Sequence, residues 1–374
     1  MRRYELDWLR VFVFSLLILY HTGMFFVPWG WHIKNNIIYE GLVWPMLFVN
    51  QWRLPILFVI SGMGTYFSIR KRDSGGYALE RLGRLGLPLV VGMLLVVPPQ
   101  VYLERISTGA FRGSFFDFWP RHAFTGSYPD GNLSWHHLWF LPYLLFYSLV
   151  SIPLFQYLNR HPGSGLIRGL RRLTRKPPGF YWLIIPLWVW EALLMPRFPS
   201  THAFWGDWYN LVHYLNLFLY GFLFMALKDH FWDLAARGRR LFLYGGLAAT
   251  MMGGVLLTQA DGVSWTSGWF AALRVFNLWS WILCLFGYAT VYLKRPGKGL
   301  AYANEAVYPF YILHQTITVG IGFLIAGKDW GLGIKFLLMA SGTFGICLML
   351  YEGVIRRIHW LRPLMGLRRK PRRG

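Results

Sequence analysis

The sequence predicts an all-α membrane protein that crosses the bilayer about ten times and keeps both termini in the cytoplasm. Of its 374 residues, 55% are hydrophobic and only 14% are charged, whereas soluble domains carry about 25% charged residues. Apolar runs of about 20 residues, the length that spans about 30 Å of hydrocarbon, recur from Trp8 to Val354. Because only short basic or Gly/Pro-rich loops separate them, we expect a single membrane domain over 1–374, with a basic cytoplasmic tail at about 356–374.

Ten apolar runs are expected to form the transmembrane helices. They are 8–28, 42–68, 85–104, 137–158, 180–195, 209–228, 241–258, 269–293, 306–326 and 333–355. The fifth is the shortest. Pro45 and Pro55 fall in the second run, which is therefore either one span or a surface segment followed by a span. The longest extracytoplasmic loop, 105–136, is long enough to act as a lid over a site.

Lysine and arginine residues set the orientation. With the N-terminus in the cytoplasm, the cytoplasmic segments hold 28 of them and the opposite side holds 7, which is the positive-inside pattern. The net charge of +22 therefore reflects membrane topology, and we expect no nucleic-acid partner. Cys284 and Cys347 both lie within spans, so no disulfide is expected. Because no Walker A, H-E-x-x-H or C-x-x-C sequence is present, we expect no metal and no nucleotide hydrolysis.

The first span carries two ionisable side chains, which are costly in a membrane and so are candidate functional residues. Arg10 and His21 are eleven residues apart, which at about 100° per residue places them on one helix face. A rise of about 16 Å puts Arg10 near the cytoplasmic boundary and His21 beyond the middle of the membrane. Asp7 precedes Arg10 by three residues and can pair with it. Alternatively, Arg10 snorkels to headgroups and His21 binds a neighbouring carbonyl.

Polar groups also lie in later spans. Arg53 in the second span either pairs structurally or binds an anion, and nearby Gly62 is expected to pack helices. His137 opens the fourth span at the outer boundary. In the ninth span, Glu305 and His314 are nine residues apart, so they point to opposite faces of a straight helix unless it bends at its proline.

Four segments, in order along the chain, resemble motifs of the acyltransferase-3 family of integral membrane acyltransferases. They are Tyr4–Arg10 followed by His21, Phe58–Gly62, His137–Leu141 and Asn304–His314. Within that family, the chain is similar to stand-alone members that succinylate periplasmic glucans. The resemblance covers nearly the whole chain and implies a multi-pass protein of the bacterial inner membrane.

The family resemblance implies an acyl-CoA donor, acetyl-CoA or succinyl-CoA, on the cytoplasmic side, and a hydroxyl of a periplasmic or cell-surface glycan as acceptor. No cofactor would be permanently bound. Arg10, with Arg53, suits the CoA phosphates, and His21 would be either a general base or a transient acyl carrier. The residues expected to orient His21 or bind substrate are Glu305, as a catalytic partner, and His137, His314 and Asp7.

Two further points stay open from the sequence. A transporter or flippase of a lipid-linked sugar also needs buried Arg and His residues, but it needs no acyl donor and no catalytic base. A homo-oligomer is compatible with the sequence, which does not identify the oligomeric state.

Overall fold

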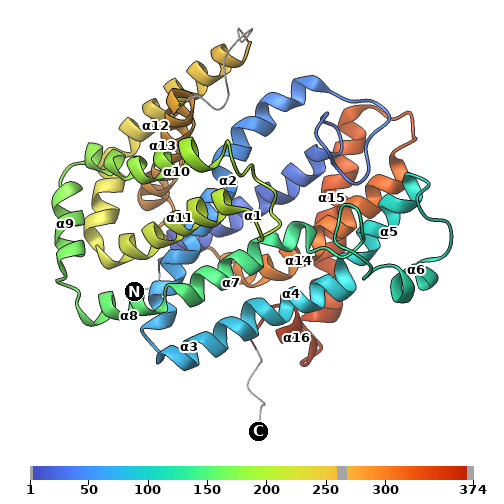
Figure 1. Cartoon of the computed structure of the whole chain (residues 1–374), viewed down its shortest axis with the longest axis horizontal. Helices are drawn as coiled ribbons and strands as arrows, with labels where there is room; N and C mark the ends of the chain where they lie inside the picture. Colours follow the sequence, from blue (N-terminus) through green and yellow to red (C-terminus); the bar gives the residue numbers. More distant parts are fainter. Residues whose placement is uncertain (1–2, 259–267, 369–374) are drawn as a thin grey trace. The chain divides into compact units, whose positions relative to one another are not determined.

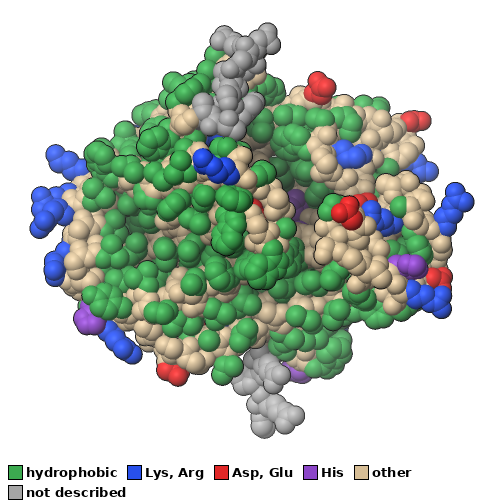
Figure 2. Space-filling model, in the orientation of Figure 1, with side chains coloured by type: hydrophobic (Ala, Val, Ile, Leu, Met, Phe, Trp, Pro, Cys, Tyr) green, Lys and Arg blue, Asp and Glu red, His purple; other side chains and the backbone are tan. Residues whose placement is uncertain are grey.

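The computed structural model describes residues 3–258 and 268–368, and its regular structure in these ranges is helical (Figure 1). Within them, seven helices are long and apolar enough to cross a membrane, or eight if the bent pair His136–Val150 and Ile152–Arg160 forms one span. Hydrophobic side chains cover much of the visible surface, as lipid contact requires (Figure 2). The all-α, multi-pass prediction is therefore confirmed, whereas the number of ten spans and the side on which the termini lie stay predictions.

The chain divides into two compact units. Unit 1 comprises Met1–Arg10, Phe48–Leu79 and Tyr143–Ala301, and unit 2 comprises Val11–Leu47, Glu80–Pro142 and Tyr302–Gly374. The long first helix, α1 (Tyr4–Met24), contributes its beginning to unit 1 and its remainder to unit 2.

Unit 1 consists mainly of helices from the middle of the chain. They include α8 (Ile152–Arg160), α9 (Gly165–Leu173), η5 (Pro177–Leu183), α10 (Ile184–Leu194), α11 (Trp208–Ala226), α12 (Asp229–Thr258) and α13 (Gly268–Tyr292). Helices α12 and α13 lie side by side, and α10 packs against α13 (Figure 1). The expected fifth and sixth spans correspond to η5 with α10 and to α11.

The second expected span is one helix, α2 (Val43–Ile69), which continues through Pro55. Pro45 lies in its first turn, where a missing N–H removes no helical hydrogen bond. Neither proline therefore breaks this segment into two helices. A Cβ atom on Gly62 would lie 1.9 Å from the carbonyl oxygen of Phe218 in α11. This contact confirms that Gly62 packs helices, because only a glycine lets the two backbones approach so closely.

Unit 2 is built on a long helical run that is interrupted by two π-helical turns. The run begins with α3 (Ser74–Arg81), most of which belongs to unit 1, and continues in unit 2 with η2 (Leu82–Gly86), α4 (Leu87–Val91), η3 (Gly92–Val96) and α5 (Pro98–Ser107). It begins earlier than the expected span 85–104. The following loop carries the short helix α6 (Phe115–Arg121), which starts with a capping box between Ser114 and Asp117. The loop folds back onto α5, where the Arg105 guanidinium donates to the carbonyls of Pro129, 2.6 Å, and Gly131, 2.7 Å.

The remaining elements of unit 2 come from later in the chain. They are η4 (His136–Trp139), α14 (Leu300–Ile325), α15 (Leu332–Leu350), η6 (Tyr351–Ile355) and α16 (Leu361–Leu364). Pro309 lies inside α14 without ending it.

The loop that follows α1 is held firmly inside unit 2. Phe25 and Phe26 are fully buried in a core cluster that also contains Val319 of α14 and Met339 of α15. The ammonium group of Lys34 donates to three backbone carbonyls at the end of α1 and just beyond it, including that of Met24 at 2.6 Å. Burial lowers the pKa of Lys34 to about 8. This anchoring fixes the end of α1 that carries His21 relative to α14.

Candidate active site

Two histidines from distant parts of the chain meet inside unit 2. His21, on α1, places its Nδ1 atom 2.8 Å from the Nε2 atom of His314, on α14. The rings stack with centroids 4.9 Å apart and planes 13° from parallel. His314 is fully buried, whereas His21 is half-buried.

Hydrogen bonds to the backbone assign the tautomers of this pair. The Nδ1 atom of His314 lies 2.8 Å from the carbonyl oxygen of Tyr311, and a carbonyl only accepts, so Nδ1 carries the hydrogen. In a neutral His314 ring, Nε2 is then the acceptor, and the N–H between the rings belongs to Nδ1 of His21. The basic nitrogen of His21 is therefore Nε2. Such an arrangement fixes a histidine in the tautomer that a general base needs.

His137 joins this pair from the start of η4. Its ring centroid is 5.2 Å from that of His314, edge to face. Its Nε2 atom lies 2.9 Å from the carbonyl oxygen of Ile312 and so donates. Its Nδ1 atom is buried and, among the described residues, has no hydrogen-bond partner. Because a buried acceptor without a partner is costly, this atom is suited to receive a hydrogen bond from a ligand.

An apolar cavity of about 140 Å³ opens beside the histidine pair, between α1 and α14. It extends along α14 from Tyr302 to His314, and Phe14 and Ser15 of α1 line it together with Phe344 of α15. Apart from His314, its lining residues carry no group that is charged near neutral pH. The cavity therefore suits an uncharged, elongated group whose end reaches the histidines.

Glu305 lies in a different cluster, at the beginning of α14. Its Oε1 atom accepts hydrogen bonds from the hydroxyl of Tyr351, at 3.0 Å, and from the guanidinium of Arg362, at 3.4 Å. The nine-residue spacing separates it from His314 by a rise of about 14 Å. The structure thus brings His21, His137 and His314 together and places Glu305 with Tyr351 and Arg362.

The remaining predicted site residues lie in unit 1. Arg10 Nη1 is 3.6 Å from Asp7 Oδ1, so the predicted pairing is confirmed. Because α1 is one continuous helix, Arg10 and His21 keep the eleven-residue helical spacing that places them on one face. Arg53 is buried, with 3% of its surface exposed, and donates to Asn50 Oδ1 at 3.3 Å.

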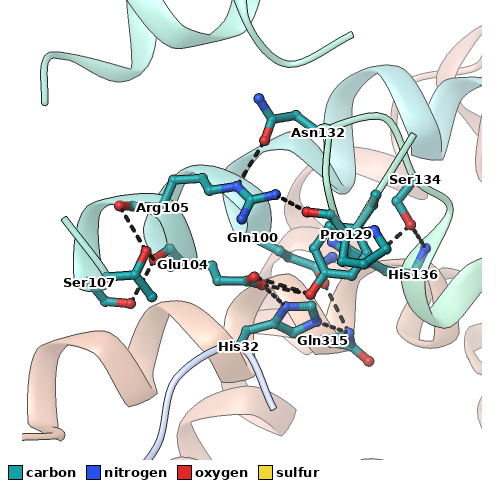
Figure 3. A network of polar contacts seen from close by, with 12 residues as sticks. His32, Gln100, Glu104, Arg105, Ser107, Pro129, Asn132, Ser134, His136 and Gln315 are labelled. Carbon is teal, nitrogen blue, oxygen red and sulfur yellow. Dashed lines mark hydrogen bonds and ion pairs between the residues drawn. The ribbon is translucent and has the colours of Figure 1, made fainter. Parts of the chain in front are cut away.

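A second polar cluster in unit 2 was missed from the sequence (Figure 3). It joins His32 from the loop after α1, Glu104 from α5, Tyr128 from the loop after α6, His136 from η4 and Gln315 from α14. One signal was available: Glu104 is an acidic residue within the expected span 85–104, and such a residue needs a partner or a function.

The described part of the chain thus combines helices long enough to cross a bilayer with a histidine pair beside an apolar cavity, an arrangement compatible with a membrane enzyme. Residues 3–352 match the family described as an acyltransferase domain. The chain therefore belongs to the acyltransferase-3 family and is a multi-pass membrane acyltransferase.

Curated relatives match over nearly the full length. The glucans biosynthesis protein C of Escherichia coli O6:K15:H31 is 24% identical over 97% of this chain and 93% of its own length. The proteins of the same name from Shigella dysenteriae serotype 1 and Escherichia coli K12 show the same identity and coverage. No solved structure matches this chain.

Proposed function

We propose that this protein moves an acetyl or succinyl group from cytoplasmic acyl-CoA to a hydroxyl of an extracytoplasmic glycan, with His21 as the general base. The observation that carries the proposal is the His21–His314 pair. A histidine whose Nδ1–H is held by a second, backbone-anchored histidine presents a basic Nε2 atom in a fixed direction. Hydroxyl acylation needs such a base at the reacting oxygen.

The proposed chemical step uses this geometry. The acceptor oxygen attacks the thioester carbonyl carbon while its proton passes to Nε2 of His21. The C–S bond then breaks, the ester forms, and the CoA thiolate leaves and takes the proton from Nε2 of His21, which regenerates the base. The positive charge that His21 gains is stabilised through its Nδ1–H bond to His314, as in other catalytic base–partner pairs. A transient acyl group on His21 is the alternative route.

The donor is assigned to the apolar cavity. A pantetheine arm in this cavity would place its thioester end beside His314, whose Nε2 atom lies 2.8 Å from Nδ1 of His21. On our topology, the beginning of α1 faces the cytoplasm, where Arg10 would bind a CoA phosphate as a charge-assisted contact. Its pairing with Asp7 would hold the guanidinium in position for this contact. Arg53, from unit 1, remains our second candidate for an anionic group of the donor.

The acceptor is proposed to be a glucan. This choice rests on the printed name of the relatives, glucans biosynthesis protein C. A donor on one side and a glucan on the other require a protein that spans the bacterial inner membrane. The seven or eight helices of membrane-spanning length among the described residues support this proposal.

The proposal is tested with purified protein in lipid nanodiscs. The protein is given radiolabelled acetyl-CoA or succinyl-CoA together with a glucan, and both CoA release and label on the glucan are followed. We expect label on the glucan with one of the two donors, which also identifies the acyl group. If folded protein turns over neither donor with any of several glycans, the transporter alternative is favoured instead.

A further inference from the structure

Glu104 is the centre of the second polar cluster (Figure 3). The Nδ1 atom of His32 contacts its Oε2 atom, and the hydroxyl of Tyr128 lies 3.1 Å from its Oε1 atom. The side chains of His32 and Glu104 are only 10% and 12% exposed. Burial, together with the Glu104 carboxylate, raises the pKa of Tyr128 to about 12. The phenol therefore stays protonated and donates to Glu104.

A chain of amides fixes the direction of these hydrogen bonds. The side-chain nitrogen of Gln315 donates to Gln100 Oε1 at 3.0 Å and to His32 Nε2 at 3.1 Å. The Gln100 nitrogen in turn donates to the hydroxyl of Thr316 at 2.7 Å. His32 Nε2 is thus an acceptor, and its Nδ1–H points at Glu104. Gln315 directly follows His314, so one turn of α14 orients both clusters.

His136 completes the cluster, and its Nε2 atom can form a hydrogen bond with a ligand. Its ring centroid lies 4.5 Å from that of His32 and 4.7 Å from that of Tyr128. The backbone of His136 has a φ of 40°, which is uncommon for a residue with a Cβ atom. Ser134 holds the residue there through its hydroxyl oxygen, 3.0 Å from the His136 N–H. The Nε2 atom of His136 is buried and, within the described ranges, has no hydrogen-bond partner.

Trp31 connects this cluster to the catalytic pair. Its ring centroid lies 5.3 Å from that of His21 and 5.2 Å from that of His32. Trp31 is half-buried, so part of its surface can contact a ligand, and an indole ring has apolar faces. A group bound over Trp31 therefore lies beside the proposed base.

We propose that Trp31, His32, Glu104, Tyr128 and His136 form the subsite for one sugar ring of the acceptor. This deepens the proposed function and rests on it. The Trp31 face covers the C–H face of the ring, while Glu104 and His136 bind its hydroxyls. The ring then presents another hydroxyl to His21.

The chemistry of the cluster favours a neutral, hydroxyl-rich ligand. A carboxylate has about four lone-pair sites, so Glu104 can accept from a sugar hydroxyl besides His32 and Tyr128. A hydroxyl both donates and accepts and therefore satisfies His136 Nε2 in either tautomer. An anionic ligand such as CoA would be repelled by Glu104. The nearby cation, Arg105, is already bound to the loop that carries Tyr128.

Binding and kinetics test the subsite separately. Protein in nanodiscs, without any acyl donor, is titrated with glucohexaose by calorimetry. Removing a stacking face or a charged acceptor costs roughly 1.4 kcal/mol or more, which corresponds to a tenfold change in Kd. We therefore expect at least about tenfold weaker binding for Trp31→Ala and Glu104→Gln, and retained binding for Trp31→Phe, which keeps an aromatic face. Trp360→Ala removes a tryptophan that is 69% exposed and is the matched control.

In the transfer assay, the same two variants should raise the KM for glucan by a similar factor and leave the KM for acyl-CoA unchanged. Parent-like glucohexaose binding by Trp31→Ala and Glu104→Gln would overturn the subsite, as would a failure of the parent to bind glucohexaose. CoA turnover by the parent with another acceptor would still uphold the proposed function in that case. Loss of binding in Trp31→Phe, with unchanged thermal unfolding, would also count against a stacking role for Trp31.

Discussion

The Nδ1 atom of His21 lies 2.8 Å from the Nε2 atom of His314, although 293 residues separate the two in the chain. The pair depends on two features of unit 2. One is the backbone carbonyl of Tyr311, which holds the Nδ1–H of His314. The other is the anchoring of the loop after α1, which fixes the end of the helix that carries His21. In the proposed reaction His314 would act through His21, as a positioning residue.

Substitution of His314 should lower the transfer rate. We expect His314→Ala to reduce kcat by about 10²-fold, because an oriented general base contributes roughly 10²–10⁴-fold and the variant leaves His21 in place but frees its tautomer. His314→Gln should recover part of this loss, since its amide oxygen can accept from His21 Nδ1–H. Initial rates at varied acyl-CoA check both expectations. Equal kcat values for the two variants would argue against the idea that His314 fixes the tautomer of His21.

The route of acyl transfer can be resolved without an acceptor. If His21 is a base in direct transfer, protein mixed with labelled acyl-CoA alone should release no stoichiometric burst of CoA and should carry no label after rapid quenching. An acyl-His intermediate would instead give one equivalent of each. Rapid-quench measurements on the parent, with His21→Ala as the blank, distinguish the two routes.

Filling the apolar cavity should impair donor use. Ala303 lines this cavity, so Ala303→Phe should raise the KM for acyl-CoA at least about tenfold because the larger side chain occupies the space assigned to the donor. Ala301 on the same helix is exposed and does not line the cavity, and Ala301→Phe is the control. Steady-state kinetics with varied acyl-CoA provide the measurement. An unchanged KM in Ala303→Phe would place the donor elsewhere.

A side chain at Gly62 should destabilise the protein, because α2 and α11 approach closely there. A Cβ atom there would meet the backbone of Phe218 at 1.9 Å, and backbone cannot move aside as a side chain does. Overpacking of this kind costs roughly 1–3 kcal/mol or more, so Gly62→Ala should unfold at a lower temperature. Gly64→Ala, two residues along, would meet its nearest neighbour only at 3.9 Å. Thermal unfolding in nanodiscs compares the two variants, and equal stability would contradict the close approach.

The helical membrane fold could be predicted from the sequence, because a hydrophobic run long enough to span a membrane can satisfy its backbone hydrogen bonds there by forming a helix. It did not show that Pro55 lies inside a continuous helix, since neighbouring helices determine whether a membrane helix tolerates proline. Nor did it show that the helical run before the loop starts at Ser74. The first part of that run includes charged side chains, which in a sequence are typical of a loop between membrane spans.

The site was predictable in part. His21, His137 and His314 were all expected near one site, and the structure brings them together. Glu305 was expected there as well, but a nine-residue helical spacing turns it to another face, where Tyr351 and Arg362 bind it. The cluster around Glu104 depends on how two loops fold back onto α5 and α14, and no periodic pattern in the sequence reports such long-range contacts.

The central claim is that His21 accepts the proton of the acceptor hydroxyl. The most direct measurement is the rate at which labelled acyl groups reach a glucan in the parent and in His21→Ala, each folded in nanodiscs. His359→Ala, which removes an exposed histidine, is the control. We predict that the parent and His359→Ala transfer label at similar rates, whereas His21→Ala loses about 10²-fold or more. Transfer by His21→Ala at the parental rate would contradict the account.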